Sequence, residues 1–158
     1  MENRSKCASD SRTEQVQIVM PGDTNGYGRL FGGRLVEWVD IVAAVVARRH
    51  SGCEVTTVSM DNLDFKAPAH VNETVVLTGS VTYTGHTSME VKVNTYAENL
   101  HGERRGINTA YVVMVALDEN EKPTSVPTLI LETDEEQAEW TAGQKRREFL
   151  NLRRINKF

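Results

Sequence analysis

The spacing of hydrophobic and polar positions predicts one long helix in the first third of the chain. Residues 35–47 read LVEWVDIVAAVVA and are charged only at Glu37 and Asp40. The length of this segment and its alanine content favour a helix over a strand. A helix that is apolar nearly all round is a buried one. Basic residues follow in RRHSGC, where Gly52 predicts the end of the helix.

After this helix the pattern changes to the period of two that is typical of half-buried strands. Met89, Val91, Val93, Thr95 and Ala97 form one face of such a segment. Strands are predicted in EQVQIVM, EVTTVSMDNLDF, TVVLTGSVTYTG, TSMEVKVNTYAENL and GINTAYVVMVALD. Short turns between successive strands indicate an antiparallel sheet, and one long apolar helix can cover one face of it. The pattern therefore predicts an α+β fold.

A second helix is predicted near the C-terminus. Thr133 is placed to cap it, with Glu136 three residues later as a capping box. Acidic residues near its start and basic residues near its end suit the helix dipole, whereas Gly143 weakens it. The tail KRREFLNLRRINKF carries six basic residues and one acidic residue. We expect this tail to be solvated or to contact another subunit, rather than to bind nucleic acid.

Length and composition indicate one globular domain with short extensions. The chain has 158 residues, of which 39% are hydrophobic, and its net charge of −4 gives no reason to expect nucleic acid binding. We predict a flexible leader over residues 1–13, a domain over 14–130, and a C-terminal helix with a basic tail over 131–158. Cys7 and Cys53 are expected to be free thiols in a reducing compartment. Neither a signal peptide nor an apolar run of ~20 residues is recognisable, so we expect a cytoplasmic protein that does not enter the membrane.

Asp40 interrupts an otherwise apolar helix. An isolated charged carboxylate in an apolar site is unfavourable unless it finds partners. Two interpretations follow. Asp40 either lies at an exposed edge of the helix or pairs with an arginine, or it is a base or nucleophile placed where desolvation makes it reactive.

Two glycines stand where a helix usually has a Ser, Thr, Asp or Asn cap. The sequence before the helix is Phe31-Gly32-Gly33. Glycines leave the first backbone N–H groups of a helix bare and allow close approach of a ligand. Bare N–H groups at the positive end of the helix dipole suit an oxygen that gains negative charge. The alternative is that the glycines only make the turn and pack tightly.

The distance between Gly32 and Asp40 limits how they can act together. At about 1.5 Å per residue they lie roughly 12 Å apart along the helix axis. A carbonyl at the helix start and an acid at Asp40 share one site only if the substrate extends along the helix or a neighbouring subunit contributes. The spacing leaves both possibilities open.

Four stretches resemble the hot-dog fold acyl-CoA thioesterases, the cytosolic acyl-coenzyme A thioester hydrolase family. They are PGDTNGYGRLFGGRLVEWVDIVAA, VTTVSMDNLDFKAP, GHTSMEV and VVMVALDENEKP, in the family's order over about residues 14–130. The resemblance implies a sheet wrapped around a central helix, and a homodimer assembled into a homohexamer. It also implies hydrolysis of acyl-CoA to a free acid and coenzyme A, without a further cofactor.

The resemblance implies roles for individual residues as well. Asp40 matches the acid that acts on the thioester, as general base or as nucleophile, and Asn25 matches an asparagine supplied across the dimer. Gly32 and Gly33 match the pair that polarises the thioester carbonyl. Many relatives have a histidine where this chain has Phe31, so any role of that histidine is absent here. Asn25 is expected to donate to a water molecule and accept from it at once.

Contacts with coenzyme A are implied for a second group of residues. Gly85, Thr87 and Ser88 match the family segment that lies along coenzyme A, although a plain β-turn is an equally good interpretation. Lys66 is a candidate for a phosphate contact, with an exposed strand-end lysine as the alternative; the basic tail is a further candidate. The four histidines are scattered without carboxylates or cysteines at metal-ligand spacing, so we expect no metal.

Two classes of function remain. The first is an acyl-CoA thioesterase, which Asp40 and Asn25 together favour. The second is a non-catalytic hot-dog module that binds acyl-CoA and regulates another process. A hot-dog dehydratase is disfavoured because those enzymes use a histidine with an acid, and the interior of this helix has no histidine.

Overall fold

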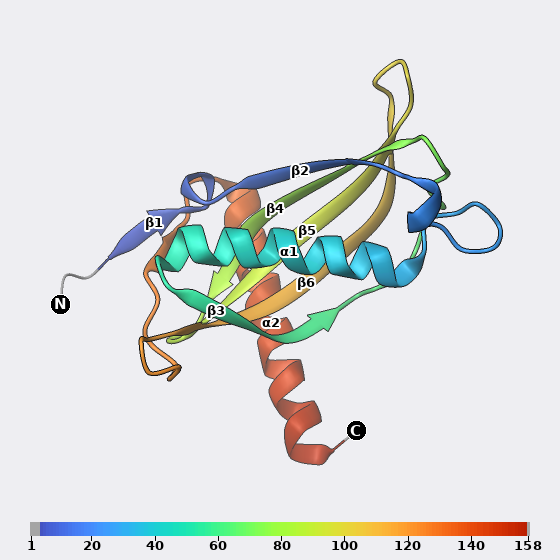
Figure 1. The fold of residues 1–158 in the computed structure, drawn as a ribbon. Helices are drawn as coiled ribbons and strands as arrows, with labels where there is room; N and C mark the ends of the chain where they lie inside the picture. Colours follow the sequence, from blue (N-terminus) through green and yellow to red (C-terminus); the bar gives the residue numbers. More distant parts are fainter. Residues whose placement is uncertain (1–3, 158) are drawn as a thin grey trace.

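The computed structural model describes residues 4–157. Its centre is helix α1 (Gly32–Ser51), and a five-stranded antiparallel sheet curls around this helix (Figure 1). The predicted α+β class, with one long helix against an antiparallel sheet, is confirmed. The sheet order is β2-β4-β5-β6-β3, and the strands are β2 (Thr13–Ile18), β3 (Glu54–Asp61), β4 (Thr74–Thr84), β5 (Ser88–Glu98) and β6 (Arg104–Leu117).

The core lies between α1 and the concave face of the sheet. The five residues predicted to share one face of β5, from Met89 to Ala97, are all fully buried. On α1 the buried positions recur every three to four residues, so one stripe of the helix faces the sheet. Burial of each large aliphatic side chain contributes about 1.5–3 kcal/mol, which makes this interface the main source of stability.

The prediction that α1 is buried nearly all round is wrong. Glu37 and Ile41 are exposed, and Asp40 is only half-buried. The sheet of a single chain wraps part of the helix and leaves one stripe open. The predicted end of the helix is confirmed, because Gly52 adopts the left-handed conformation with φ of 69° and closes the last turn.

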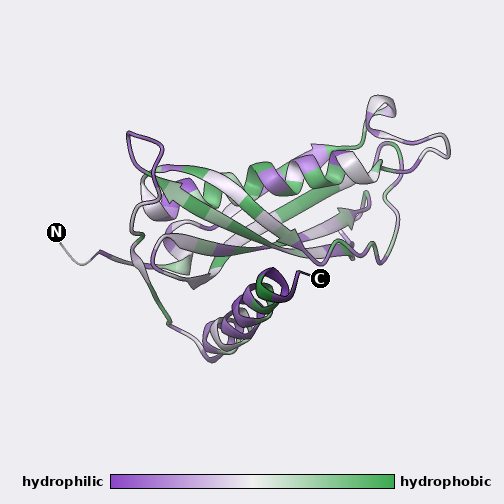
Figure 2. Ribbon diagram, turned by 90° about the horizontal axis from the view of Figure 1, so that it is seen from below, coloured by the Kyte–Doolittle hydropathy of each residue, from purple (hydrophilic) through white to green (hydrophobic). Residues whose placement is uncertain are grey.

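Helix α2 (Asp134–Asn156) packs on the convex face of the sheet, opposite α1 (Figure 2). Thr133 Oγ1 accepts a hydrogen bond from Glu136 N at 3.0 Å, which confirms Thr133 as the cap. The reciprocal half of the predicted capping box differs, because the Glu136 carboxylate accepts from Glu132 N at 2.7 Å instead of from Thr133 N. The helix crosses the sheet at Gly143, where a Cβ atom would lie 2.8 Å from Cβ of Tyr83. This glycine lowers helix propensity, but the close approach of helix and sheet requires it.

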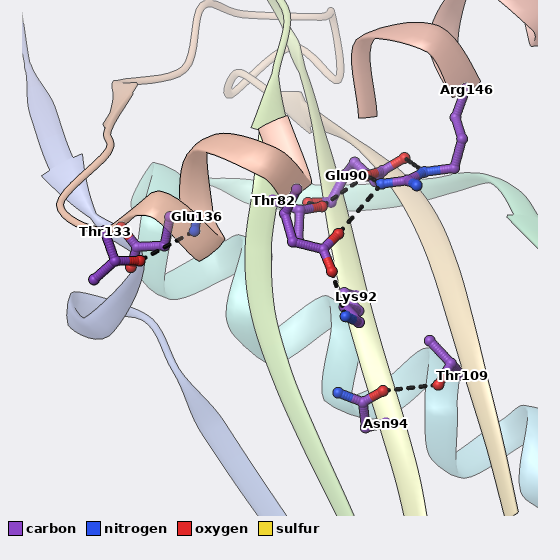
Figure 3. Close-up of polar contacts among 9 residues, drawn as sticks. Thr82, Glu90, Lys92, Asn94, Thr109, Thr133, Glu136 and Arg146 are labelled. Carbon is purple, nitrogen blue, oxygen red and sulfur yellow. Dashed lines mark hydrogen bonds and ion pairs between the residues drawn. The ribbon is translucent and has the colours of Figure 1, made fainter. Parts of the chain in front are cut away.

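The basic tail is not solvated along its length, contrary to one expectation from the sequence. Arg146 forms two hydrogen bonds with the carboxylate of Glu90, at 2.8 and 2.9 Å, and Glu90 also accepts one from Thr82 (Figure 3). Arg147 donates to Ser88 on the same face. Charge-assisted, bidentate pairs of this kind are the stronger ones, so they hold α2 against the sheet.

The expectation of a loose leader up to residue 13 is also wrong over the described residues. Strand β1 (Ser5–Cys7) pairs in parallel with β7 (Thr128–Ile130), and Thr13 already belongs to β2. Two short 3-10 helices, η1 (Ala8–Asp10) and η2 (Pro21–Asp23), follow β1 and β2. Both cysteines are free, as expected.

Candidate active site

The first turn of α1 presents unbonded backbone N–H groups, as its glycines predict. Phe31 at the N-cap makes no side-chain cap, and the first helical hydrogen bonds run from Arg34 and Leu35 to the Phe31 carbonyl at 3.0 and 3.2 Å. Over residues 4–157, the N–H groups of Gly32 and Gly33 have no hydrogen-bond partner. They lie at the positive end of a 20-residue helix, where they can stabilise a developing oxyanion.

Both glycines also lie against aromatic rings. A Cβ atom at Gly32 would lie 3.4 Å from Cζ of Phe65, an ordinary contact. A Cβ atom at Gly33 would lie 2.6 Å from Cε1 of Phe31, so a side chain there would displace the ring. Because Phe31 is 57% exposed and its ring can move, this contact does not by itself require a glycine at position 33.

Asn25 holds the loop that precedes α1. Its Oδ1 accepts from the backbone N–H groups of Tyr27 at 2.9 Å and Arg29 at 3.3 Å, and its own N–H donates to Arg29 O at 2.8 Å. These two donors occupy both lone pairs of the amide oxygen. The expectation that Asn25 both donates to and accepts from a water is therefore corrected: only its side-chain N–H₂ is free to bind a substrate or a water.

A cavity of about 300 Å³ opens beside the first turn of α1. Asn25, Gly32 and Lys66 line it, so the structure brings three of the predicted residues together. Arg29 lines it too, and sequence reasoning did not single out this residue. Its charge in a glycine-rich loop was the only available signal.

Asp40 does not line this cavity. It lies further along α1, where its Oδ1 accepts a hydrogen bond from Thr57 Oγ1 at 2.7 Å. Thr57 is in β3 and pairs with the core residue Met114, so its side chain faces α1. The register of β3 shifts between Thr57 and Ser59, and bulges of this kind often re-aim a side chain beside an active site.

Thr57 is a candidate residue that sequence reasoning missed. It lies in EVTTVSMDNLDF among other β-branched residues, and no pattern separates it from its neighbours. Only the packing of β3 beside α1 reveals that it meets Asp40.

The predicted coenzyme A segment lies at the other end of the sheet. Gly85, Thr87 and Ser88 form the turn between β4 and β5, which is near the end of α1 rather than its start (Figure 1). Ser88 is buried, and its hydroxyl accepts a hydrogen bond from Arg147. One chain therefore does not bring this segment to the cavity at Gly32.

No helix among residues 4–157 is both long and apolar enough to cross a membrane. In the same part of the chain, no three His, Cys, Asp or Glu side chains lie close enough together to hold a metal ion.

Comparison with known proteins decides the family. The model of the thioesterase superfamily matches residues 27–102. The uncharacterized acyl-CoA thioester hydrolase YkhA of Bacillus subtilis is 39% identical over 152 residues, which cover 95% of this chain and 88% of that protein. The chain belongs to the acyl-CoA thioester hydrolases of the thioesterase superfamily.

Solved structures of acyl-CoA thioester hydrolases share the fold. An apo-hexameric acyl-CoA thioesterase superposes with a TM-score of 0.90 at 39% identity, over 95% of this chain and 97% of that one. The acyl-CoA hydrolase of Staphylococcus aureus, in complex with butyryl coenzyme A, coenzyme A and coenzyme A disulfide, has a TM-score of 0.90 at 32% identity, over 97% and 94%. Structures of three alanine variants of that enzyme, at an aspartate, an asparagine and a threonine, match as well.

Proposed function

We propose that this chain hydrolyses acyl-CoA thioesters to a free carboxylic acid and coenzyme A. One observation carries the proposal. The asparagine, aspartate and threonine replaced in the Staphylococcus aureus enzyme occur in the same order, and with the same spacing, as Asn25, Asp40 and Thr57. The hydrogen bond between Thr57 and Asp40 brings two of these three residues into direct contact.

The residues present supply the chemistry of thioester hydrolysis. The N–H groups of Gly32 and Gly33 donate hydrogen bonds to the thioester carbonyl oxygen and stabilise the oxyanion that forms on attack, by about 3 kcal/mol for one donor. Asp40 removes a proton from a water molecule, whose oxygen attacks the carbonyl carbon. The C–S bond then breaks, and the thiolate of coenzyme A leaves and takes up a proton. No cofactor is needed, because water is the only co-substrate.

A second route starts from the same geometry. Asp40 attacks the thioester directly, forms an anhydride, and water hydrolyses it. The two routes differ in the oxygen that enters the product. In a single turnover in ¹⁸O-water, the general-base route places ¹⁸O only in the acid, whereas the nucleophile route places it in Asp40 when water attacks the Asp40 carbonyl of the anhydride; ¹⁸O in Asp40 therefore identifies the nucleophile route.

The site is proposed to be shared between two subunits. Gly32 and Asp40 of one chain lie roughly 12 Å apart along α1, and Asp40 is outside the cavity that Asn25 and Gly32 line. The exposed stripe of α1 has Ile41, 46% exposed, and the edge strand β3 has Val58, 42% exposed, so both elements offer apolar surface to a second copy. We propose a homodimer through this surface, assembled into a hexamer as in the hexameric thioesterase that matches this chain.

Contacts with the coenzyme A moiety are proposed for two groups of residues. Lys66 and Arg29 are exposed at the cavity and suit the phosphates. The turn with Gly85 and Thr87 comes from the partner subunit in this arrangement. Ser88 contributes to that turn through its backbone, because its hydroxyl is bound to Arg147.

The test is release of coenzyme A, followed with a thiol reagent, from acyl-CoA esters of increasing chain length. We expect turnover with at least one ester. If the protein binds acyl-CoA in equilibrium dialysis but releases no coenzyme A from any of them, it is a non-catalytic acyl-CoA-binding module, and the proposed hydrolysis is wrong.

A further inference from the structure

We infer that the cavity beside the first turn of α1 holds the acyl chain, with Ile107 as its floor and Phe65 as its lid, and that it limits the length of chain accepted. This inference rests on the proposed thioester hydrolysis and adds the substrate class. Its evidence is the polarity, the anchoring and the volume of the cavity.

The polarity of the cavity changes from its mouth to its floor. Leu35, Ala69 and Ile107 are 1%, 2% and 1% exposed and form an apolar floor. Arg29 and Lys66 are exposed and form a cationic rim. Gly32, with its free N–H group, also lines the cavity. An acyl-CoA molecule has the same order of groups: an apolar chain, a thioester carbonyl and, beyond the pantetheine arm, anionic phosphates.

The walls are held in place by backbone hydrogen bonds. Leu30 N donates to Ala69 O at 2.7 Å, and Lys66 N donates to Ile107 O at 2.8 Å. These bonds join the segment after β3 both to the loop before α1 and to strand β6. The cavity is therefore already formed without a ligand, as most binding pockets for small molecules are.

Phe65 lies at the opening. Its ring is in contact range of Gly32, and the residue is 51% exposed. The loop before it is tied down by Asn108, whose Nδ2 donates to the carbonyls of Asn62 and Asp64 at 3.1 and 2.8 Å. A ring in this place covers the first carbons of an acyl chain when the thioester is at Gly32.

The volume gives a limit on chain length. An apolar cavity of about 150 Å³ holds one benzene molecule, so the cavity of about 300 Å³ accommodates a chain of up to roughly ten carbon atoms. Each buried methylene favours binding by about fourfold. We therefore expect kcat/KM to rise from acetyl-CoA to about decanoyl-CoA and not to rise further to palmitoyl-CoA.

The experiment measures kcat/KM for this series in the wild type and in three variants. Ile107→Ala deepens the floor, so the chain length with the highest kcat/KM shifts upward by two or more carbons. Phe65→Ala removes the lid and lowers kcat/KM for octanoyl-CoA at least tenfold, with little change for acetyl-CoA. Leu63→Ala is the matched control, since Leu63 is an exposed apolar residue of the same loop that does not line the cavity.

Three results would overturn the inference. One is a profile that rises continuously to palmitoyl-CoA in the wild type. The second is an unchanged profile in Phe65→Ala, a surface substitution that stays informative if Ile107→Ala does not fold. The third is equal affinity of an Asp40→Asn variant for short and medium acyl-CoA esters in equilibrium binding. That binding measurement needs no turnover, so it separates failure of this inference from failure of the proposed hydrolysis.

Discussion

The carboxylate of Asp40 accepts a hydrogen bond from the hydroxyl of Thr57 at 2.7 Å. Asp40 is half-buried and lies beside the exposed stripe of α1. Asp40→Asn keeps a carbonyl oxygen for the Thr57 hydrogen bond, so we expect the fold and the assembly to be retained. The amide is neither basic nor nucleophilic, so kcat should fall by at least 100-fold. The measurement is steady-state hydrolysis by purified protein, with circular dichroism as a check of folding. A variant with activity within about threefold of wild type would show that Asp40 has no chemical role.

His50 is a fully buried histidine at the end of α1. Its Nε2 donates to Pro127 O at 2.8 Å, and Nδ1 has no partner among the described residues. Burial lowers the pKa of His50 below its usual value, although the hydrogen bond to Pro127 opposes this in part. The unfolded chain therefore takes up a proton near pH 6.5 that the folded chain does not.

The free energy of unfolding should fall as the pH drops below about 6.5, until the folded pKa is reached. We expect His50→Gln to flatten this part of the pH profile, because a neutral amide can donate to Pro127 O and does not titrate. The measurement is urea unfolding between pH 5 and 8 at one protein concentration. His101→Gln, in an exposed loop, should keep the wild-type slope. If both variants keep the wild-type slope, His50 is not the group that causes the loss of stability below about pH 6.5.

The sequence predicted the individual residues only where their type is distinctive. A carboxylate in an apolar helix and a glycine pair without a capping side chain marked Asp40, Gly32 and Gly33 as candidates. Thr57 could not be found, since its contact with Asp40 depends on the register of β3 beside α1. The sequence also could not predict that the Asn25 side chain is left only as a donor. Its oxygen accepts from the backbone N–H groups of Tyr27 and Arg29 only in the folded loop.

Among the elements, α2 is held to the sheet by partly buried polar contacts in addition to the packing of Trp140 on Tyr83. The Glu90 side chain is 6% exposed and Arg146 25%, and the guanidinium of Arg146 also lies 3.7 Å above the ring of Tyr111. Removing one partner of such a pair leaves a buried charge without compensation.

We expect Arg146→Met to destabilise the protein by about 2 kcal/mol, less than for a fully buried pair because Arg146 is partly exposed. The double variant Arg146→Met/Glu90→Gln should recover part of this loss, since the unpaired charge of Glu90 is then absent. Chemical denaturation measures the free energy of unfolding of both variants. Arg154→Met, at an exposed position of the same helix, is the control. Equal effects of Arg146→Met and Arg154→Met would show that the pair does not hold α2.

The five strands of the main sheet and both helices followed from periodicity and capping signals, which act over a few residues. What the sequence did not predict requires contacts between distant segments. Residues 5–7 are too few and too polar to signal a strand, and they form β1 only because β7 offers a parallel partner. The basic tail suggested a solvated surface, and its anchoring required a carboxylate on β5 that faces α2.

In the whole molecule, the candidate residues of one chain fall into three places. Asn25 and Gly32 line the cavity, Asp40 lies with Thr57 further along α1, and the turn at Thr87 is at the opposite end of the sheet. The central claim is that a second subunit brings these places together. A monomeric mass in light scattering at micromolar concentration would contradict that claim at once.

The most direct test is complementation between two inactive variants. If Asn25 and Asp40 meet only across the subunit boundary, a heterodimer of Asn25→Ala with Asp40→Asn has one site with both lesions and one site with none. With random pairing, half of the dimers are mixed and each has one of two sites intact. Provided that the sites act independently, the activity of an equal mixture approaches about a quarter of wild type.

The measurement is coenzyme A release after the two variants are refolded together, with each variant refolded alone as control and mixed dimers verified by mass spectrometry. Our account predicts recovery to about a quarter of the wild-type rate. Mixed dimers whose activity stays at the level of the single variants would contradict it, because Asn25 would then act within its own chain or have no part in the reaction.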